Sequence, residues 1–263
     1  MTKVHGQPIW FELMTAGGRL AAAGDFYKAV LGWQIADSGM EGFAYHLATS
    51  EGDMVAGLME IPDNAAGMPP SWMLYFGVDD ADRAAADVTA AGGHVHKGPD
   101  DIPGTGRFAV LSDPQGVPFG VLAPLPMMEG DAGGHAFDQR KAGHGNWTEL
   151  MTTDPRAGLR FYADLFGWTA GEAMDMGAMG TYQLFRHDGT DIGGMMGITE
   201  GQQPFWLAYF GVNGVNPAIG RIRDAGGAVQ HGPQEVPGGA HIAVATDPQG
   251  AWFAVVGPLE TSA

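Results

Sequence analysis

Apolar residues recur along the chain with two alternating periods. Short stretches such as "PIWFELMT" at 8–15 and "NWTELMT" at 146–152 are rich in aromatic and aliphatic residues, which favours strands. The segments that follow, "RLAAAGDFYKAVLGW" at 19–33 and "DPRAGLRFYADLFGW" at 154–168, carry apolar residues at helical spacing. The pattern therefore predicts a strand followed by a helix at two distant places.

Residues with known capping preferences mark the ends of the predicted helices. Asp154 is suited to the N-cap, Pro155 to the first helical position and Gly167 to the position after the last turn. A later segment, "NPAIGRIRDAGG", predicts a helix with Asn216 as its cap and Pro217 at its first position.

Three short strands are expected after each of the first helices, over roughly 33–62 and 168–199. The pattern then restarts with "SWMLYFGV" at 71–78 and "FWLAYFGV" at 205–212, again followed by a helical segment and closing strands. The chain thus predicts the order βαβββ four times.

The sequence repeats itself over nearly its whole length. The stretch "LSDPQGVPFG" at 111–120 returns as "ATDPQGAWFA" at 245–254, and other segments return in the same order. A period this long indicates a duplicated domain rather than a solenoid. We predict a first domain at 1–125, a linker at 126–143 that lacks apolar periodicity, and a second domain at 144–263.

Composition narrows the classes of partner. The 263 residues include 45% hydrophobic residues and carry a net charge of −17, which argues against binding to nucleic acid or to anionic membranes. The absence of cysteine excludes disulfides, thiolate zinc sites and cysteine nucleophiles. No targeting segment or long apolar run is recognisable, so we expect a cytoplasmic protein.

Three of the repeated motifs resemble those of a known superfamily. "FYKAVLGW" at 26–33, "AAGGHV" at 90–95 and "SDPQGVPFGVL" at 112–122, in this order and duplicated, resemble the vicinal oxygen chelate superfamily of glyoxalase I, extradiol dioxygenases and bleomycin and fosfomycin resistance proteins. The two-domain glyoxalase-like branch is the most similar. The resemblance implies an α+β fold in which four βαβββ units form two tandem glyoxalase-like domains, each with a cupped mixed sheet around a ligand cavity.

The resemblance also implies where a metal would be held. In metal-dependent members a carboxylate ligand stands seven residues after the Asp of the D-P-Q-G motif, and here Gly120 and Ala254 take those places. The other ligand positions align with Trp10, Trp147, Met73, Leu207, His46 and Gln183. One suitable ligand in four is too few for a catalytic divalent ion. We therefore expect no metal and no other cofactor.

Two glutamates are the leading candidates for chemistry. If Trp10 and Trp147 point into the cavities like the ligands they replace, strand alternation places Glu12 and Glu149 there too. In a structural interpretation each carboxylate is hydrogen-bonded to the backbone or to a Tyr of its own domain. In a functional interpretation each is a ligand anchor or a catalytic general base with a raised pKa. The sequence leaves both open.

Other residues are weaker candidates for the site. Tyr75 and Tyr209 are candidate ligand contacts, although strand aromatics are more often core. Arg107 and His241 hold equivalent places before the two D-P-Q-G turns and could face a ligand oxygen, although a solvent-facing position explains them as well. With the residues aligned to the ligand positions, the ligand-binding candidates are Trp10, Trp147, His46, Gln183, Tyr75, Tyr209, Arg107 and His241. His135 and His144, at the linker, are expected to have no chemical role.

Three kinds of function remain open. The first is a metal-free protein that binds a small hydrophobic, aromatic or cationic molecule. The second is a glyoxalase-like lyase or isomerase, or a dioxygenase, acting on a small oxygenated substrate. The third is a protein-interaction module that has kept only the fold. We favour the first, with a small molecule as the partner, and expect either a monomer whose two domains mimic a dimer or a homodimer.

Overall fold

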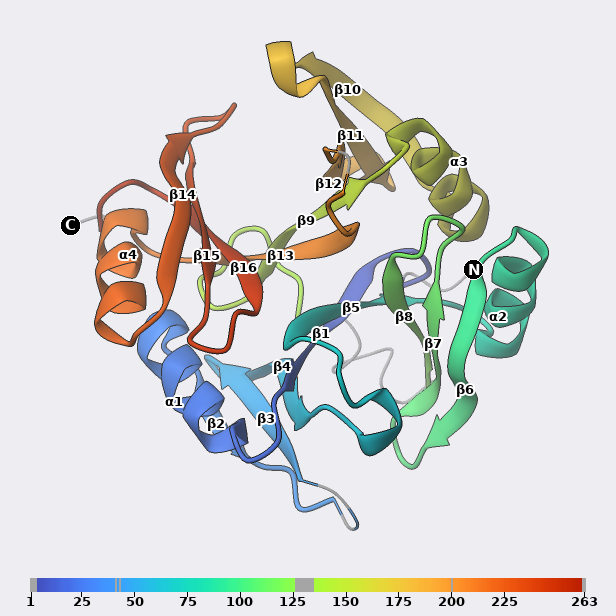
Figure 1. Ribbon diagram of the computed structural model, residues 1–263, viewed down its shortest axis with the longest axis horizontal. Coiled ribbons are helices and arrows are strands. Elements are labelled where there is room, and N and C mark those ends of the chain that lie inside the picture. The colour runs from blue at the N-terminus through green and yellow to red at the C-terminus, as the bar shows by residue number, and fades with distance from the viewer. Residues whose placement is uncertain (1–3, 41, 43, 126–134, 200, 262–263) are drawn as a thin grey trace. The chain divides into compact units, whose positions relative to one another are not determined.

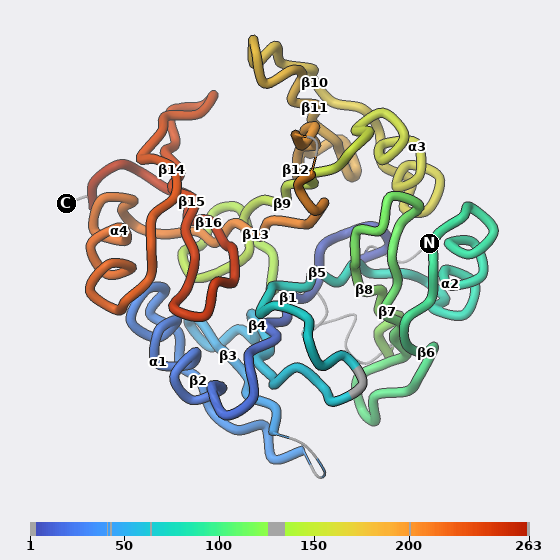
Figure 2. Tube along the Cα trace, in the orientation of Figure 1, coloured from blue at the N-terminus to red at the C-terminus, as the bar shows by residue number. Residues whose placement is uncertain are grey.

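The computed structural model describes residues 4–40, 42, 44–125, 135–199 and 201–261. The elements follow the order βαβββ four times, as the sequence predicts (Figures 1 and 2). The first repeat contains β1 (Pro8–Thr15), α1 (Leu20–Leu31), β2 (Gln34–Asp37), β3 (Tyr45–Ser50), β4 (Asp53–Glu60), β5 (Ser71–Gly77), α2 (Ala81–Ala90), β6 (His94–Ile102), β7 (Gly106–Ser112) and β8 (Pro118–Pro124). The second contains β9 (Gly145–Thr152), α3 (Pro155–Phe166), β10 (Thr169–Asp175), β11 (Thr181–His187), β12 (Thr190–Gly197), β13 (Phe205–Gly211), α4 (Val215–Asp224), β14 (Ala228–Glu235), β15 (His241–Thr246) and β16 (Trp252–Gly257).

The strands form two mixed eight-stranded sheets. Their orders are β2-β3-β4-β1-β5-β8-β7-β6 and β10-β11-β12-β9-β13-β16-β15-β14. In each sheet the first strand of a βαβββ unit runs parallel to the last strand of the same unit, as β1 does to β4 and β13 to β16. The α+β class and the tandem βαβββ architecture are therefore confirmed. No helix in the described part of the chain is long and apolar enough to span a membrane.

The predicted ends of helix α3 are confirmed in detail. The Asp154 carboxylate accepts a hydrogen bond of 3.0 Å from the backbone N–H of Ala157, and Pro155 begins the helix. Gly167 follows the last turn with φ of 74°, a left-handed conformation that glycine adopts without strain.

Helix α4 begins one residue before the predicted cap. Val215 is its first residue, so Asn216 and Pro217 lie inside its first turn, and Asn216 is not the cap as predicted. The backbone N–H groups of Val215 and Asn216 instead donate to the carbonyls of Pro258 and Leu259, at 2.8 and 2.9 Å. The helix start needs no side-chain cap because the C-terminal segment supplies the acceptors.

By packing, the chain forms two compact units that cut across the repeats. One unit comprises the described residues of Met1–Ile9, Met73–Gly134 and Trp147–Leu207; the other comprises those of Trp10–Trp72, His135–Asn146 and Ala208–Ala263. Each unit thus takes one βαβββ quarter from each repeat. We call them the 73–207 unit and the 10–263 unit. The predicted boundaries at 125 and 143 remain a prediction, and positions 126–134 of the predicted linker lie outside the described residues.

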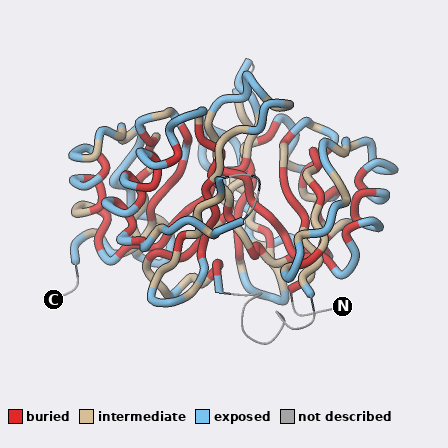
Figure 3. The backbone as a smooth tube through the Cα atoms, turned by 90° about the horizontal axis from the view of Figure 1, so that it is seen from below, coloured by how far each residue is buried: buried red, intermediate tan, exposed pale blue. Residues whose placement is uncertain are grey.

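Each unit has its own aromatic core. In the 73–207 unit, helices α2 and α3 lie side by side (Figure 1), and Phe76 contacts Phe166, Trp168 and Trp206 with ring centroids 5.1–5.3 Å apart. In the 10–263 unit, α1 lies beside α4 and Phe210 packs on a second aromatic group that includes Trp33 and Trp72. Buried residues line one side of each helix and run along the strands (Figure 3).

The D-P-Q-G turn of the first repeat is tied to the second repeat by a buried carboxylate. One oxygen of Asp113 accepts the backbone N–H groups of Gln115 and Val117, at 2.8 and 2.9 Å. The other accepts the hydroxyl of Tyr162 at 3.2 Å, and that hydroxyl accepts the indole N–H of Trp206 at 3.3 Å. Burial raises the pKa of Asp113, and the hydrogen bonds from the two backbone N–H groups oppose this rise.

The second copy of the turn is built in the same way. Asp247 accepts the backbone N–H groups of Gln249 and Ala251, at 2.8 and 2.9 Å, and the hydroxyl of Tyr27 at 3.3 Å. Trp72 donates to Tyr27 at 2.9 Å. Each D-P-Q-G turn is therefore hydrogen-bonded to the first helix of the other repeat, α3 or α1. Equivalent residues of the two repeats make both contacts.

The glutamine of each motif extends this docking. The Gln115 side-chain oxygen accepts from the Thr152 hydroxyl and the Asp154 N–H, at 2.8 and 2.6 Å. Gln249 accepts from the N–H of Ala16 at 3.0 Å. Both aspartates thus form hydrogen bonds within their own turns, and they also join the repeats within each compact unit.

Candidate functional site

Burial along β1 shows which side chains share a face. Phe11 and Leu13 are fully buried, whereas Trp10 and Glu12 are partly exposed. Strand β9 repeats this pattern, with Leu150 buried and Glu149 partly exposed. Because successive side chains of a strand point to opposite faces, the tryptophan and the glutamate lie together on the less buried face.

A tyrosine joins the tryptophan and the glutamate in the first repeat. The indole N–H of Trp10 donates to the hydroxyl oxygen of Tyr45 at 3.0 Å. That hydroxyl donates to Oε2 of Glu12 at 3.1 Å. The three side chains form one directed chain of hydrogen bonds that ends on the carboxylate.

The second repeat contains the same chain. Trp147 donates to the hydroxyl of Tyr182 at 2.9 Å, and Tyr182 donates to Oε2 of Glu149 at 2.9 Å. The tyrosine contact is the one expected from the structural interpretation of the glutamates. It leaves the functional interpretation open, because a carboxylate has room for more than one donor.

A glycine makes room for each tyrosine. Gly57 pairs with Glu12 across β1 and β4, and a Cβ atom at Gly57 would overlap the hydroxyl of Tyr45. Gly194 pairs with Glu149, and a Cβ atom there would overlap the ring of Tyr182. The ring crosses the neighbouring strand only because that strand has no side chain at this position.

The electrostatics keep both tyrosines as donors. Burial raises the pKa of Tyr45, and the negative charge of Glu12 raises it further. Burial and the charge of Glu149 act in the same direction on Tyr182. Each phenol therefore stays protonated at neutral pH and donates to the carboxylate.

We call the two equivalent surfaces the acidic aromatic faces. Each is defined by seven residues that share one side of three neighbouring strands by register and alternation. In the 10–263 unit they are Trp10, Glu12, Met14, Tyr45, Leu47, Gly57 and Met59. In the 73–207 unit they are Trp147, Glu149, Met151, Tyr182, Leu184, Gly194 and Met196.

The positions of the superfamily's carboxylate ligand carry no donor. Tyr75 pairs with Gly120, and its ring fills the space in which a side chain at 120 would begin. Tyr209 pairs with Ala254, which is fully buried. Among the described residues, no three His, Cys, Asp or Glu side chains are grouped so as to hold a metal ion. The donor set therefore does not fit a divalent metal.

His46 and Gln183 lie one position beyond the tyrosines and so on the opposite faces of β3 and β11. His46 pairs with Leu58, a fully buried core residue. The amide of Gln183 donates to the carbonyls of Gly171 and Leu184, at 3.0 and 2.9 Å. Neither residue lies on the same strand face as the glutamate.

Arg107 and His241 belong to β7 and β15. The Arg107 guanidinium contacts Asp82 at 2.6 Å and Asp101 at 2.9 Å, and these carboxylates raise its pKa. Arg107 thus has the solvent-facing position that the sequence offered as the alternative to a ligand contact. His241 begins β15, and its Nδ1 is buried with no hydrogen-bond partner among the described residues.

Sequence reasoning did not single out Tyr45 and Tyr182. A signal was present, because "YHL" at 45–47 and "YQL" at 182–184 are equivalent in the two repeats. The aligned glycines in "VAGLM" and "IGGMM" were a second signal. Neither pattern shows that the tyrosine ring reaches across a strand to the glutamate.

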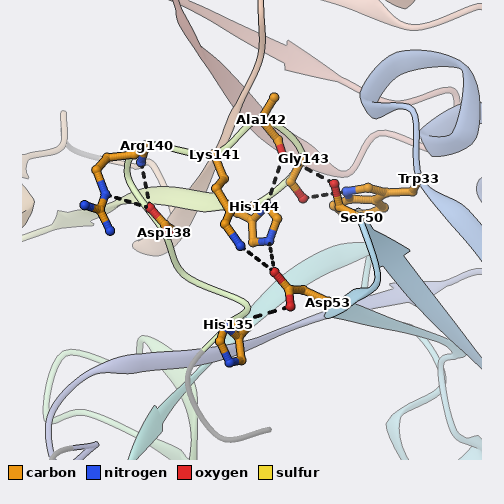
Figure 4. Close-up of polar contacts among 10 residues, drawn as sticks. All are labelled: Trp33, Ser50, Asp53, His135, Asp138, Arg140, Lys141, Ala142, Gly143 and His144. Atoms are coloured by element: carbon orange, nitrogen blue, oxygen red, sulfur yellow. Dashed lines mark hydrogen bonds and ion pairs between the residues drawn. The ribbon is translucent and has the colours of Figure 1, made fainter. Parts of the chain in front are cut away.

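The histidines near the linker take part in a polar cluster (Figure 4). Asp53 accepts from Lys141 at 2.7 Å, Nε2 of His144 lies 3.2 Å from the same carboxylate, and His135 lies 3.9 Å from it. His144 is fully buried, with its second ring nitrogen 2.9 Å from the Ala142 carbonyl. These histidines thus have a structural role, because they help to hold residues 135–146 against β4; the prediction that they have no chemical role stays a prediction.

A pocket with a volume of about 410 Å³ lies beside this segment. It lies between residues 139–146, the turn after β13 and the C-terminal end of β16. None of the predicted site residues lines it.

Asp53→Ala is expected to lower the free energy of unfolding by about 1–2 kcal/mol, because it removes the acceptor of Lys141 and the polar neighbour of Nε2 of buried His144. The Lys141 hydrogen bond, helped by His144, lowers the pKa of Asp53 below its usual value. A lowered pKa means that the stabilisation is complete above the unfolded value near 4 and is lost as the pH falls through the folded value. Urea unfolding between about pH 3 and 7 should show the difference from the wild type shrinking at the acid end. Asp25→Asn, which removes an exposed pair with Lys28, is the control and should change little.

Comparison with known proteins agrees with this architecture. The family described as Glyoxalase/Bleomycin resistance protein/Dioxygenase superfamily matches residues 12–121 and 145–255. The "Putative glyoxylase CFP32" of Mycobacterium bovis is 32% identical over 260 residues, covering 97% of this chain and 95% of that protein. The "Anthracycline biosynthesis protein DnrV" of Streptomyces peucetius is 32% identical over 269 residues, covering 95% of this chain and 93% of that protein.

Solved structures share the fold at low sequence identity. A Mn(II)-bound glyoxalase from Novosphingobium aromaticivorans has a TM-score of 0.67 at 17% identity, covering 99% of this chain and 84% of that one. The 2,3-dioxygenase LapB from Pseudomonas sp. KL28 has a TM-score of 0.66 at 14% identity, covering 97% and 93%. With a match over both repeats and relatives that align along nearly the whole length, the chain belongs to the Glyoxalase/Bleomycin resistance protein/Dioxygenase superfamily.

Proposed function

We propose that this protein binds a small, largely aromatic molecule on its acidic aromatic faces without a metal ion. One observation carries the proposal: the Trp–Tyr–Glu chain occurs with the same atoms in both repeats, on the partly exposed side of the first strand. On the other side of these strands Phe11, Leu13 and Leu150 are fully buried.

The chemistry of the faces suits such a guest. Apart from one glutamate, one tyrosine hydroxyl and one indole N–H, each face consists of apolar groups, including two methionines. Ligand sites are commonly apolar and aromatic, with a few placed polar groups that orient the guest. Methionine adapts to irregular shapes and contacts aromatic rings favourably.

The relatives are compatible with a small-molecule role and differ in their named roles. One is named a putative glyoxylase, and another is named for the biosynthesis of an anthracycline. A metal-dependent lyase, isomerase or dioxygenase reaction has no support in the donor set, because Gly120 and Ala254 hold the carboxylate positions. Binding is the function that the faces themselves support.

Titration with 1-naphthalenemethanol tests the proposal. We expect saturable binding, followed by calorimetry and by quenching of tryptophan fluorescence, and no stoichiometric Zn, Mn, Fe or Ni in elemental analysis of the same sample. The double variant Trp10→Leu with Trp147→Leu should lose about tenfold or more in affinity, as expected for aromatic anchors. Trp252→Leu is the matched control, since Trp252 is 44% exposed and lies on neither face.

Two results would contradict this. One is failure of any aromatic probe to bind to the folded protein. The other is one transition metal per repeat after mild purification, because the metal would need ligands other than those assigned here.

A further inference from the structure

We propose that His94 and His96 of the first repeat form an exchangeable site for a divalent transition-metal ion such as Cu²⁺. The site is separate from the acidic aromatic faces and goes beyond the proposed function. Neither histidine stands at one of the superfamily's ligand positions. The proposal follows from the spacing of the two imidazole rings, from the polar contact that positions one of them and from their accessibility.

The two histidines lie on the outermost strand of a sheet. Strand β6 ends the order β5-β8-β7-β6 (Figure 1), and both side chains are exposed. Residues two apart on a strand point to the same side, so the two imidazoles share one face of β6. A metal ion can therefore reach both rings from solvent.

The separation of the rings matches that of two ligands on one metal ion. The ring centroids of His94 and His96 are 5.1 Å apart, with an angle of 65° between the ring planes. With metal–nitrogen bonds of about 2.1 Å and an angle of about 100° at the metal, the centroids of two bound imidazoles are about 5 Å apart. The pair thus already has the ring spacing of a two-histidine site.

A β-bulge and a serine position the second ring. The register between β6 and β7 shifts between Val95 and Lys97, which leaves His96 as the extra residue of the bulge. Nε2 of His96 lies 3.0 Å from Oγ of Ser112, the partner of His94 across the two strands. Metal-bound histidines commonly donate their second ring N–H to a nearby oxygen, which fixes the ring. Ser112 is placed to accept such a bond, and Nδ1 of His96 is then the nitrogen left for the ion.

The chemistry of the pair favours particular ions. Imidazole suits Cu²⁺, Ni²⁺ and Zn²⁺, whereas Mg²⁺ and Ca²⁺ take oxygen ligands. Burial and the adjacent His94 lower the pKa of His96, which favours the neutral ring that a metal requires. The positive charge of Lys97 is offset by the Asp100 carboxylate at 3.9 Å. Two protein ligands leave the other coordination positions to water, so we expect an ion that exchanges freely and binds only when it is supplied.

The second repeat provides an internal comparison. Gln230 has the place of His96, and its amide donates to the Thr246 hydroxyl at 3.2 Å. Ala228 has the place of His94 and pairs with Thr246. The register of β14 and β15 shifts at the equivalent point, so the bulge recurs without the two histidines. We therefore expect this kind of site in the first repeat only.

Calorimetry with Cu²⁺, Ni²⁺ and Mg²⁺ on chelator-treated protein tests the site. We expect about one Cu²⁺ per chain, weaker binding of Ni²⁺ and no binding of Mg²⁺. The electron paramagnetic resonance spectrum of the Cu²⁺ complex should show coupling to the nitrogens of both imidazoles. The double variant His94→Asn with His96→Asn should lose about tenfold or more in Cu²⁺ affinity. His231→Asn, at an exposed position of β14, is the matched control and should leave it unchanged.

A gain of binding tests the geometry. Ala228→His with Gln230→His transfers the pair to the second repeat, where the bulge is already present. The number of Cu²⁺ ions bound per chain should then rise from about one to about two. If this variant folds and the number does not rise, the strand geometry does not create the site and the proposal is wrong.

Two other results overturn the proposal. One is wild-type protein that binds no Cu²⁺. The other is a folded double variant of His94 and His96 that binds Cu²⁺ as tightly as the wild type, because the ion would then be held elsewhere. If that variant does not fold, the nitrogen coupling of the wild type decides, since a complex without two imidazoles contradicts the site. The proposed function is tested separately, because 1-naphthalenemethanol should bind to the chelator-treated protein.

Discussion

Replacing Asp113 or Asp247 with alanine should lower the free energy of unfolding by about 3–4 kcal/mol. Each carboxylate accepts two backbone N–H groups and one tyrosine hydroxyl in a buried place. Alanine leaves all three donors without their acceptor. The loss also frees the tyrosine that receives the indole N–H of a tryptophan, so the whole chain is weakened.

Urea unfolding of the two variants measures the effect. Tyr162→Phe and Tyr27→Phe are the matched controls, because each removes only the hydroxyl link and should cost about 1–1.5 kcal/mol. In thermal melts the aspartate variants should lose roughly 6–16 °C, at the 2–4 °C per kcal/mol typical of this size. If an aspartate variant lost less stability than its tyrosine partner, the turn would not depend on the carboxylate as described.

Gly57→Val and Gly194→Val should damage both the fold and the proposed site. A Cβ atom at either position overlaps a tyrosine side chain, and valine adds two methyl groups in the same space. The tyrosine must leave its position between tryptophan and glutamate, and overpacking of this kind costs about 1–3 kcal/mol. We also expect the affinity for 1-naphthalenemethanol to fall about tenfold or more, since the displaced tyrosine and the added methyl groups change the surface on which its ring packs.

Gly17→Val is the control for the conformational cost of replacing glycine. Gly17 is exposed, and a Cβ atom there has no neighbour within 4 Å. Its stability and its affinity for 1-naphthalenemethanol should both stay near wild type. If the Gly57 and Gly194 variants behaved like the Gly17 variant, tyrosine placement would not matter for binding.

The aspartate and glutamate hydrogen-bond chains occupy different places in the duplicated architecture. The aspartate chains join one repeat to the other inside each compact unit, whereas the glutamate chains lie within a single βαβββ quarter. The packing of one βαβββ quarter on another thus depends on the aspartate chains. The polar groups of the acidic aromatic faces depend on the glutamate chains. Variants in the two chains should therefore be nearly additive in stability.

Local pattern alone determined the elements of this protein. Strand and helix periods, the Asp154 cap, Gly167 and the D-P-Q-G turn depend on neighbouring residues, so one sequence is enough to predict four βαβββ units. Strand alternation likewise placed Glu12 on the face of Trp10, because parity along a strand is a local property. The start of α4 was misplaced because its acceptors, Pro258 and Leu259, lie some 40 residues away in the chain.

Contacts between distant residues were decided only by the tertiary structure. The sequence contains both copies of D-P-Q-G, but not the fact that Asp113 meets Tyr162 of the other repeat, since either repeat could have supplied the partner. It contains Tyr45, but the ring reaches Glu12 only because Gly57 leaves space on the intervening strand. His144 is buried against Asp53 because residues 135–146 pack on β4, although their composition resembles a linker. In each case the deciding quantity is the space and the unsatisfied hydrogen-bonding groups that another segment presents, and no periodicity along the chain encodes these.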